Sequence, residues 1–62
     1  MRVKLRQLRL EKNLTQEEMA KLCDITRAYY TNIENAKNLP SLKVAIKIKG
    51  VLEYYSDDLF IN

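Results

Sequence analysis

Apolar residues recur at helical spacing along most of the 62-residue chain. Leu5 and Leu8 lie three residues apart in a first segment that ends near Asn13, a residue type that can close a helix in the left-handed conformation. Since the sequence holds one proline and one glycine, short connections between helices are expected. The pattern predicts an all-α fold of five helices. In the second to fifth of these helices, the apolar residues that are expected to face the core are Met19, Ala20, Cys23, Tyr29, Tyr30, Ile33, Leu42, Ala45, Ile46, Ile48, Val51, Leu52, Leu59 and Phe60.

Capping residues mark where these helices begin. Thr15, with a glutamate three residues later, forms a capping box and predicts the start of the second helix. Thr26 is a plausible N-cap for a third helix over about residues 27–35. Ser41 and Ser56 are the corresponding caps of the fourth and fifth helices.

Composition excludes several classes of function. The chain has no histidine and one cysteine, so the commonest general base is missing and no intramolecular disulfide can form. Cys23 lies on an apolar helix face and is expected to be a buried, inert thiol. No apolar stretch approaches the length that spans a bilayer. We therefore expect one domain over residues 1–62 that is cytoplasmic, is not an enzyme, and needs neither a metal nor another cofactor.

Charge is distributed unevenly, although the net charge is only +3. Residues 1–12 carry about +4 and residues 36–50 about +4, whereas residues 13–35 and 51–62 are net negative. Two basic segments that flank a polar centre suit a polyanion that spans both of them. Solvated helix faces would give the same pattern, so charge alone leaves both interpretations open.

The second and third predicted helices form a helix-turn-helix over about residues 16–35. From Val3 to Phe60 the chain resembles the Cro and lambda-repressor type (Xre-type) helix-turn-helix family of bacterial and phage transcriptional regulators. The segments that carry the resemblance are LRQLR, LTQEEMA, ITRAYYTNIENAK, LPSL and DDLF. The resemblance implies a compact, five-helix, lambda-repressor-like domain that binds double-stranded DNA sequence-specifically, with the helix over about 27–35 in the major groove.

The resemblance also assigns roles to individual residues. If Tyr30 and Ile33 face the core, helical geometry places the base-reading residues on the opposite face. Base readers are expected at Arg27, Ala28 and Asn32, with Thr31 nearby. Contacts to the DNA backbone are expected from Gln16, Thr26, Asn35, Lys37, Lys43 and Arg6. Tyr29 is expected either to contact a phosphate or to pack against the loop before the fourth helix.

Other positions are expected to be structural. Arg9 and Glu34 match a pair that forms an internal salt bridge in many family members, so Arg9 is expected to orient the reading helix rather than bind DNA. Tyr30 replaces the usual aliphatic residue and is expected to be buried with its hydroxyl at the surface. Asn13 and Asp24 stand where the family usually has glycine, and both residue types tolerate positive φ.

The resemblance further implies a homodimer on a two-fold symmetric operator, with half-sites about 34 Å apart. Residues 54–62 are the expected dimer contact, and repression is the expected mode of regulation. The alternative is a protein-binding module of the same fold, such as an antitoxin or an adaptor. An exposed apolar patch around Leu10, Leu22 and Leu39 would favour that alternative.

Overall fold

The computed structural model describes residues 1–61, and Asn62, the last residue of the expected dimer contact, lies outside the described residues. The helices are α1 (Val3–Glu11), α2 (Gln16–Leu22), α3 (Arg27–Glu34) and α4 (Leu42–Leu52), followed by a 3-10 turn, η1 (Asp57–Phe60). Within residues 1–61 no strand forms, so the all-α prediction is confirmed for that part of the chain. The five-helix prediction is wrong, because the last segment is one 3-10 turn, too short to repay the cost of starting an α-helix.

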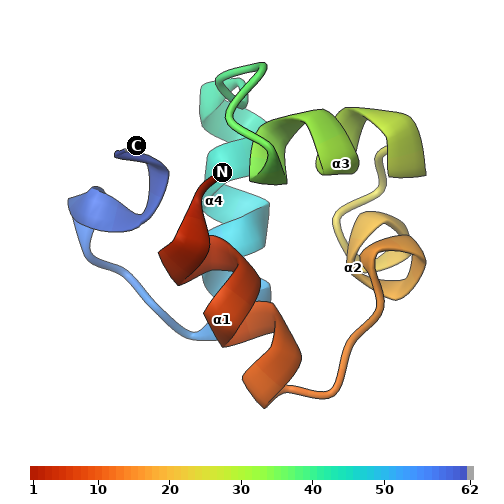
Figure 1. The fold of residues 1–62 in the computed structure, drawn as a ribbon, viewed down its shortest axis with the longest axis horizontal. Helices are drawn as coiled ribbons and strands as arrows, with labels where there is room; N and C mark the ends of the chain where they lie inside the picture. The colour runs from red at the N-terminus through yellow and green to blue at the C-terminus, as the bar shows by residue number, and fades with distance from the viewer. Residues whose placement is uncertain (62) are drawn as a thin grey trace.

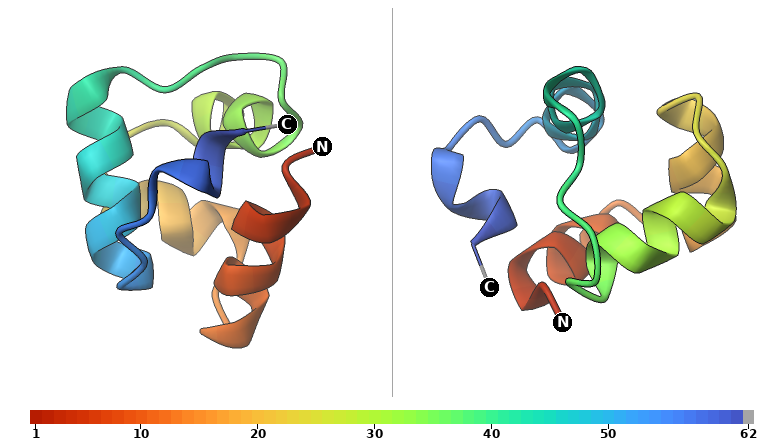
Figure 2. Two further views of the ribbon diagram at one scale, coloured as in Figure 1. Left: turned by 90° about the vertical axis from the view of Figure 1, so that its left-hand side faces the viewer. Right: turned by 90° about the horizontal axis from the view of Figure 1, so that it is seen from above.

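The helices surround one centre (Figure 1). In that view α3 lies across the top, α1 lies below it on the left and α2 below it on the right, and α4 runs from top to bottom behind α1. Figure 2 shows that the two ends of the described segment, residues 1–61, lie beside the loop that leaves α3. None of the helices in residues 1–61 is long and apolar enough to cross a membrane.

Local caps explain where the helices start and stop. Thr15 accepts a hydrogen bond from the Glu18 backbone N–H at 3.0 Å, and Glu18 Oε1 accepts one from the Thr15 N–H at 2.9 Å, which completes the predicted capping box. Thr26 and Ser41 cap α3 and α4 in the same way through their hydroxyl oxygens. Four residues in the connections adopt the left-handed backbone conformation, and none of them is glycine. They are Asn13, Asp24, Ala36 and Glu53.

The core lies where all the helices meet and consists of Leu5, Met19, Ala20, Cys23, Tyr30, Ile33, Val44, Ile48, Leu52 and Leu59. Burial raises the pKa of the Cys23 thiol, which agrees with the expected inert cysteine. The prediction that Leu42 and Ile46 face the core is wrong. Their exposed fractions are 79% and 61%, because α4 turns Val44 and Ile48 inward instead.

Gly50 lies in α4 at a position where the structure does not require glycine. Its φ is not positive, its surface is exposed, and a Cβ built there has no described atom within 4 Å. We expect Gly50→Ala to raise the free energy of unfolding by about 1 kcal/mol, because alanine loses less backbone entropy in a helix. Chemical denaturation of both proteins measures the difference. An unchanged stability would contradict the expected gain, and a lower stability would show that this turn of α4 depends on glycine.

Candidate nucleic-acid interface

The helices α2 and α3 pack against each other across a short turn (Figure 1). Asp24 in this turn has φ 57°, and the backbone N–H of Ile25 donates to the carbonyl of Ala20 at 3.0 Å. The left-handed residue therefore reverses the chain direction, as expected for a position where glycine is usual. The result is a helix-turn-helix in which α3 is the second helix.

The two faces of α3 differ in burial. Tyr30 and Ile33 are fully buried, and so is Glu34. The predicted base readers lie on the other side, and so does the neighbouring Thr31. Arg27 and Ala28 are exposed, and Thr31 and Asn32 are partly exposed. These four residues together line one open depression on the surface. The structure thus brings the three predicted base readers, and Thr31 beside them, to one face.

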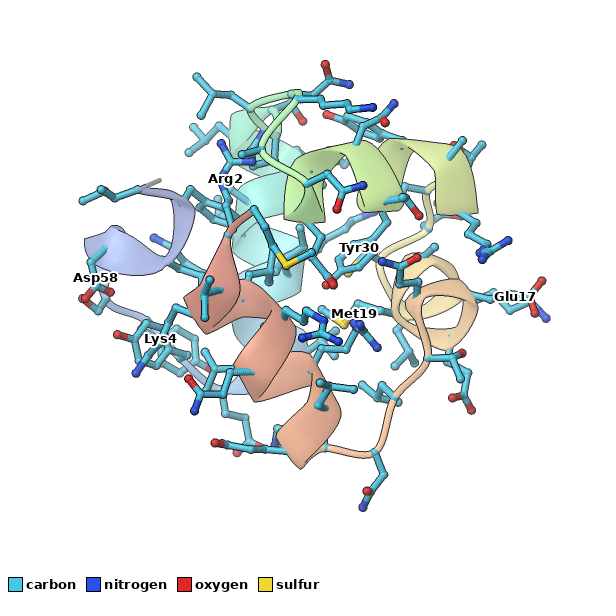
Figure 3. The ribbon with its side chains drawn as sticks, in the orientation of Figure 1. Arg2, Lys4, Glu17, Met19, Tyr30 and Asp58 are labelled. Carbon is cyan, nitrogen blue, oxygen red and sulfur yellow. The ribbon has the colours of Figure 1, made fainter. Side chains whose placement is uncertain are left out.

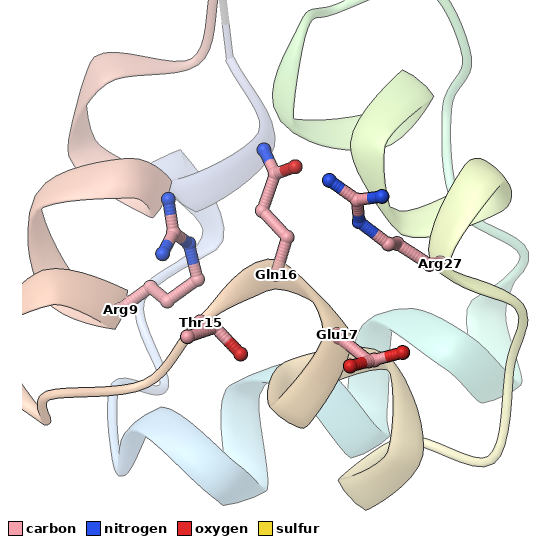
Figure 4. Close-up of a pocket in the computed structure, with 5 residues that line it drawn as sticks. All are labelled: Arg9, Thr15, Gln16, Glu17 and Arg27. Carbon is pink, nitrogen blue, oxygen red and sulfur yellow. The ribbon is translucent and has the colours of Figure 1, made fainter.

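Gln16, the first residue of α2, fixes the spacing between α2 and α3. Its Oε1 accepts a hydrogen bond from the Thr31 hydroxyl at 3.0 Å, and its Nε2 donates to Glu34 Oε1 at 3.4 Å. An ionised carboxylate only accepts, so the amide nitrogen must face Glu34 and the amide oxygen must face Thr31. Figure 4 shows this amide between the guanidinium groups of Arg9 and Arg27, in a second open depression that Thr15 and Glu17 also line.

Arg9 and Glu34 form a two-pronged ion pair that ties α1 to the end of α3. Arg9 Nε lies 2.9 Å from Glu34 Oε2 and Arg9 Nη2 lies 3.0 Å from Glu34 Oε1, while Nη1 donates to the carbonyl of Leu14. Burial alone would raise the pKa of Glu34, but the hydrogen bonds and positive charge of Arg9 outweigh burial and hold that pKa below 4.5. The contacts of Arg9 are therefore internal, as expected for a residue that orients α3.

Tyr30 differs from its prediction in one atom. The ring is buried as expected, but the hydroxyl oxygen is buried too and has no hydrogen-bond partner among the described residues. Figure 3 shows the side chain directed away from α3 into the centre of the protein. Burial, followed by the nearby Glu34 carboxylate, raises the pKa of this phenol. The expected surface hydroxyl was wrong because Arg9 and Glu34 cover that position.

The other predicted DNA contacts lie at the ends of α3. Thr26 Oγ1 accepts from the Tyr29 backbone N–H at 3.1 Å, and Tyr29 Oη accepts from the Ser41 N–H at 3.2 Å. Of the two expected roles for Tyr29, packing against the loop before α4 is therefore present. Asn35, the C-cap of α3, is partly buried, while Lys37 is exposed in the following loop.

Arg2 is a structural residue that no sequence pattern indicated. Its side chain is buried, with an exposed fraction of 2% for the residue, and its guanidinium donates to three backbone carbonyls, those of Ile33, Asn38 and Phe60. It therefore joins the end of α3, the following loop and η1, and its positive charge suits the C-terminal end of a helix. No sequence signal separated it from the other basic residues of the first segment.

Comparisons with known proteins agree with this geometry. The family model described as "Helix-turn-helix" matches residues 5–59. The chain is 56% identical over 48 residues to the HTH-type transcriptional regulator YqaF of Bacillus subtilis (strain 168), covering 77% of this chain and 63% of that protein. It is 39% identical over 61 residues to an HTH-type transcriptional regulator of Archaeoglobus fulgidus, covering 98% of this chain and 86% of that one.

A third relative is the control protein C.MunI of Mycoplasma sp, 43% identical over 58 residues, with 92% of this chain and 78% of that protein covered. No solved structure gave a significant match. The chain spans just under two thirds of the length of the Bacillus protein, at 63%. Because the family model covers most of the sequence, this chain belongs to the Xre-type helix-turn-helix family of DNA-binding transcriptional regulators.

Proposed function

We propose that this protein binds double-stranded DNA sequence-specifically and reads the major groove with α3. The observation that carries the proposal is the set of four residues on one open face, Arg27, Ala28, Thr31 and Asn32. Their face is opposite the buried Tyr30 and Ile33, so α3 can enter a groove without unpacking the core.

Three of these four residues have a suitable partner among the bases. Arg27 can donate two hydrogen bonds to O6 and N7 of guanine, and Asn32 can bond N6 and N7 of adenine. Ala28 presents a methyl group that can contact the methyl group of thymine. No described residue forms an ion pair with Arg27, so its guanidinium is available to DNA.

Backbone contacts would hold α3 in register. Gln16 has an amide hydrogen beyond the one that points to Glu34, and Thr26 and Tyr29 each keep a hydroxyl hydrogen that can be donated to a phosphate. Asn35 and Lys37 lie at the other end of α3, and the exposed Arg6 and Lys43 add positive charge. Binding at a promoter would exclude other proteins from it, which makes repression the proposed mode of action.

Selection from a random duplex library at one fixed salt concentration tests the proposal. We expect an enriched motif with two related half-sites about 34 Å apart, because the two reading helices of a dimer would enter successive major grooves on one side of the duplex. Failure to enrich any motif would contradict base reading by α3. It would favour the alternative, a protein-binding module of this fold that acts as an antitoxin or an adaptor.

We also propose that the protein binds DNA as a homodimer. The exposed residues Leu39, Leu42, Ile46 and Ile61, here called the apolar patch, would form the contact with the second copy. Leu39 and Ile61 each follow a residue whose carbonyl accepts from Arg2, so the loop after α3 and the C-terminal segment meet there. Of the contact expected over residues 54–62, this proposal keeps Ile61 and adds residues of α4 and of the loop before it. Tyr54 is instead engaged within the protein, because Lys4 lies over its ring and its hydroxyl donates to Asp58.

Ile46→Asp is expected to weaken self-association more than tenfold, since it places a charge in a surface that the second copy would bury. Sedimentation at several concentrations measures this. Leu22→Asp is the matched control, because Leu22 is 57% exposed, close to the 61% of Ile46, and lies on α2 outside the patch. Equal association of both variants and the unmodified protein would contradict the proposed contact.

A further inference from the structure

The hydroxyl of Thr31 forms a hydrogen bond within the protein, although Thr31 lines the outer face of α3. It donates its hydrogen to Gln16 Oε1 at 3.0 Å, and that oxygen is held in place because the same amide donates to the buried Glu34. Turning the hydroxyl toward DNA would break this chain of hydrogen bonds. The group that Thr31 retains for a partner in the groove is therefore its methyl group.

Ala28 adds a second methyl group to the same surface. It is exposed and lines the depression that Thr31 also lines. Residues three apart on a helix have Cβ atoms about 5–6 Å apart, and successive base pairs are stacked at about 3.4 Å. Two methyl groups at this spacing can reach the edges of adjacent base pairs.

In the major groove, the apolar feature of an unmodified base is the C5 methyl group of thymine. Cytosine acquires the same group when it is methylated at C5. We propose that Ala28 and Thr31 select a step of two adjacent pyrimidines that carry C5 methyl groups, and that 5-methylcytosine is preferred over cytosine there. The proposal rests on the proposed function and adds the chemistry by which two of the four readers discriminate.

Duplexes that differ by one methyl group test the proposal. In the selected operator, each thymine is replaced in turn by deoxyuridine, which removes the methyl group and keeps every hydrogen-bonding group. We expect binding to weaken about fourfold for each of two adjacent replacements and to be unchanged elsewhere. At the same two positions, 5-methylcytosine is expected to bind about fourfold more tightly than cytosine.

Two substitutions at Thr31 separate its methyl group from its hydroxyl. Thr31→Ser keeps the hydroxyl for Gln16 and lacks the methyl group, so it should bind the thymine and deoxyuridine duplexes equally at one position. Thr31→Val keeps a methyl group and loses the hydroxyl. It should retain the fourfold preference while binding all duplexes more weakly, because α3 is no longer held by Gln16. Circular dichroism checks that both variants are folded.

The outcomes distinguish this proposal from the proposed function. An enriched operator that binds equally well with deoxyuridine at every position would overturn methyl reading and leave sequence-specific binding standing. Methyl reading by Thr31 is also overturned if Thr31→Ser keeps the full preference for thymine. If no motif is enriched at all, the proposed function fails and methyl reading fails with it.

Discussion

Replacing Arg9 with methionine is expected to lower the free energy of unfolding by about 3–5 kcal/mol at pH 7, because Glu34 would be left buried without its partner. Methionine keeps much of the apolar stem, so the loss reports on the charge rather than on packing. A 62-residue domain has roughly 3–9 kcal/mol of stability. The variant should therefore lose a large part of the stability of the protein, as denaturation followed by circular dichroism would show.

The contribution of Glu34 to the pH dependence of the free energy of unfolding should have opposite signs in the unmodified protein and in Arg9→Met. In the unmodified protein the pKa of Glu34 is lowered from 4.5, so the pair stabilises above that pH and the stabilisation is lost as the pH falls through the folded-state pKa. In the variant, burial without Arg9 raises this pKa. The protonated carboxyl then favours folding below about pH 4.5, and that contribution is lost as the pH rises through the raised pKa. The difference in the free energy of unfolding between Arg9→Met and the unmodified protein should therefore become smaller as the pH is lowered.

The double variant Arg9→Met, Glu34→Met is the control for this prediction. Removing both charges takes away the unpaired carboxylate, so the double variant should be more stable than Arg9→Met alone. An Arg9→Met protein within about 1 kcal/mol of the unmodified protein, with the same acid dependence, would show that the ion pair does not hold α1 to α3.

Arg27→Ala is expected to weaken binding to the selected operator by about 1–3 kcal/mol and to leave binding to random duplexes much less affected. The reason is that a bidentate contact to guanine discriminates among bases, whereas a phosphate contact does not. Fluorescence anisotropy at one salt concentration measures both affinities. Since Arg27 is exposed on α3, the stability of the variant should stay close to that of the unmodified protein.

Lys37→Ala provides the comparison. Lys37 is exposed after α3 and is proposed to contact a phosphate, so its loss should weaken binding to all duplexes by the same factor and reduce the dependence on salt. Equal losses on selected and random duplexes for Arg27→Ala would count against base reading by Arg27.

Much of the fold could be predicted because local signals and packing agree. Thr15, Thr26 and Ser41 cap helices where the sequence indicates them, and Asn13 and Asp24 adopt the positive φ that their residue types tolerate. The two faces of α3 also follow from helical geometry, since Tyr30 and Ile33 at helical spacing define the buried side.

The rest depends on contacts between distant residues. Apolar residues surround much of α4, so periodicity alone could not say that Leu42 and Ile46 point outward. Arg2 binds carbonyls from Ile33, Asn38 and Phe60, and the sequence carries no pattern for such a contact. The bond between Gln16 and Thr31 likewise depends on how α2 packs against α3.

Parallel selections with the unmodified protein and with Arg27→Ala show whether the outer face of α3 reads base sequence. Both proteins are exposed to the same random duplex library at the same salt concentration, and the enriched motifs are compared position by position. We expect the variant to lose its preference at one base pair of each half-site and to keep the others. Identical motifs from the two proteins would contradict it.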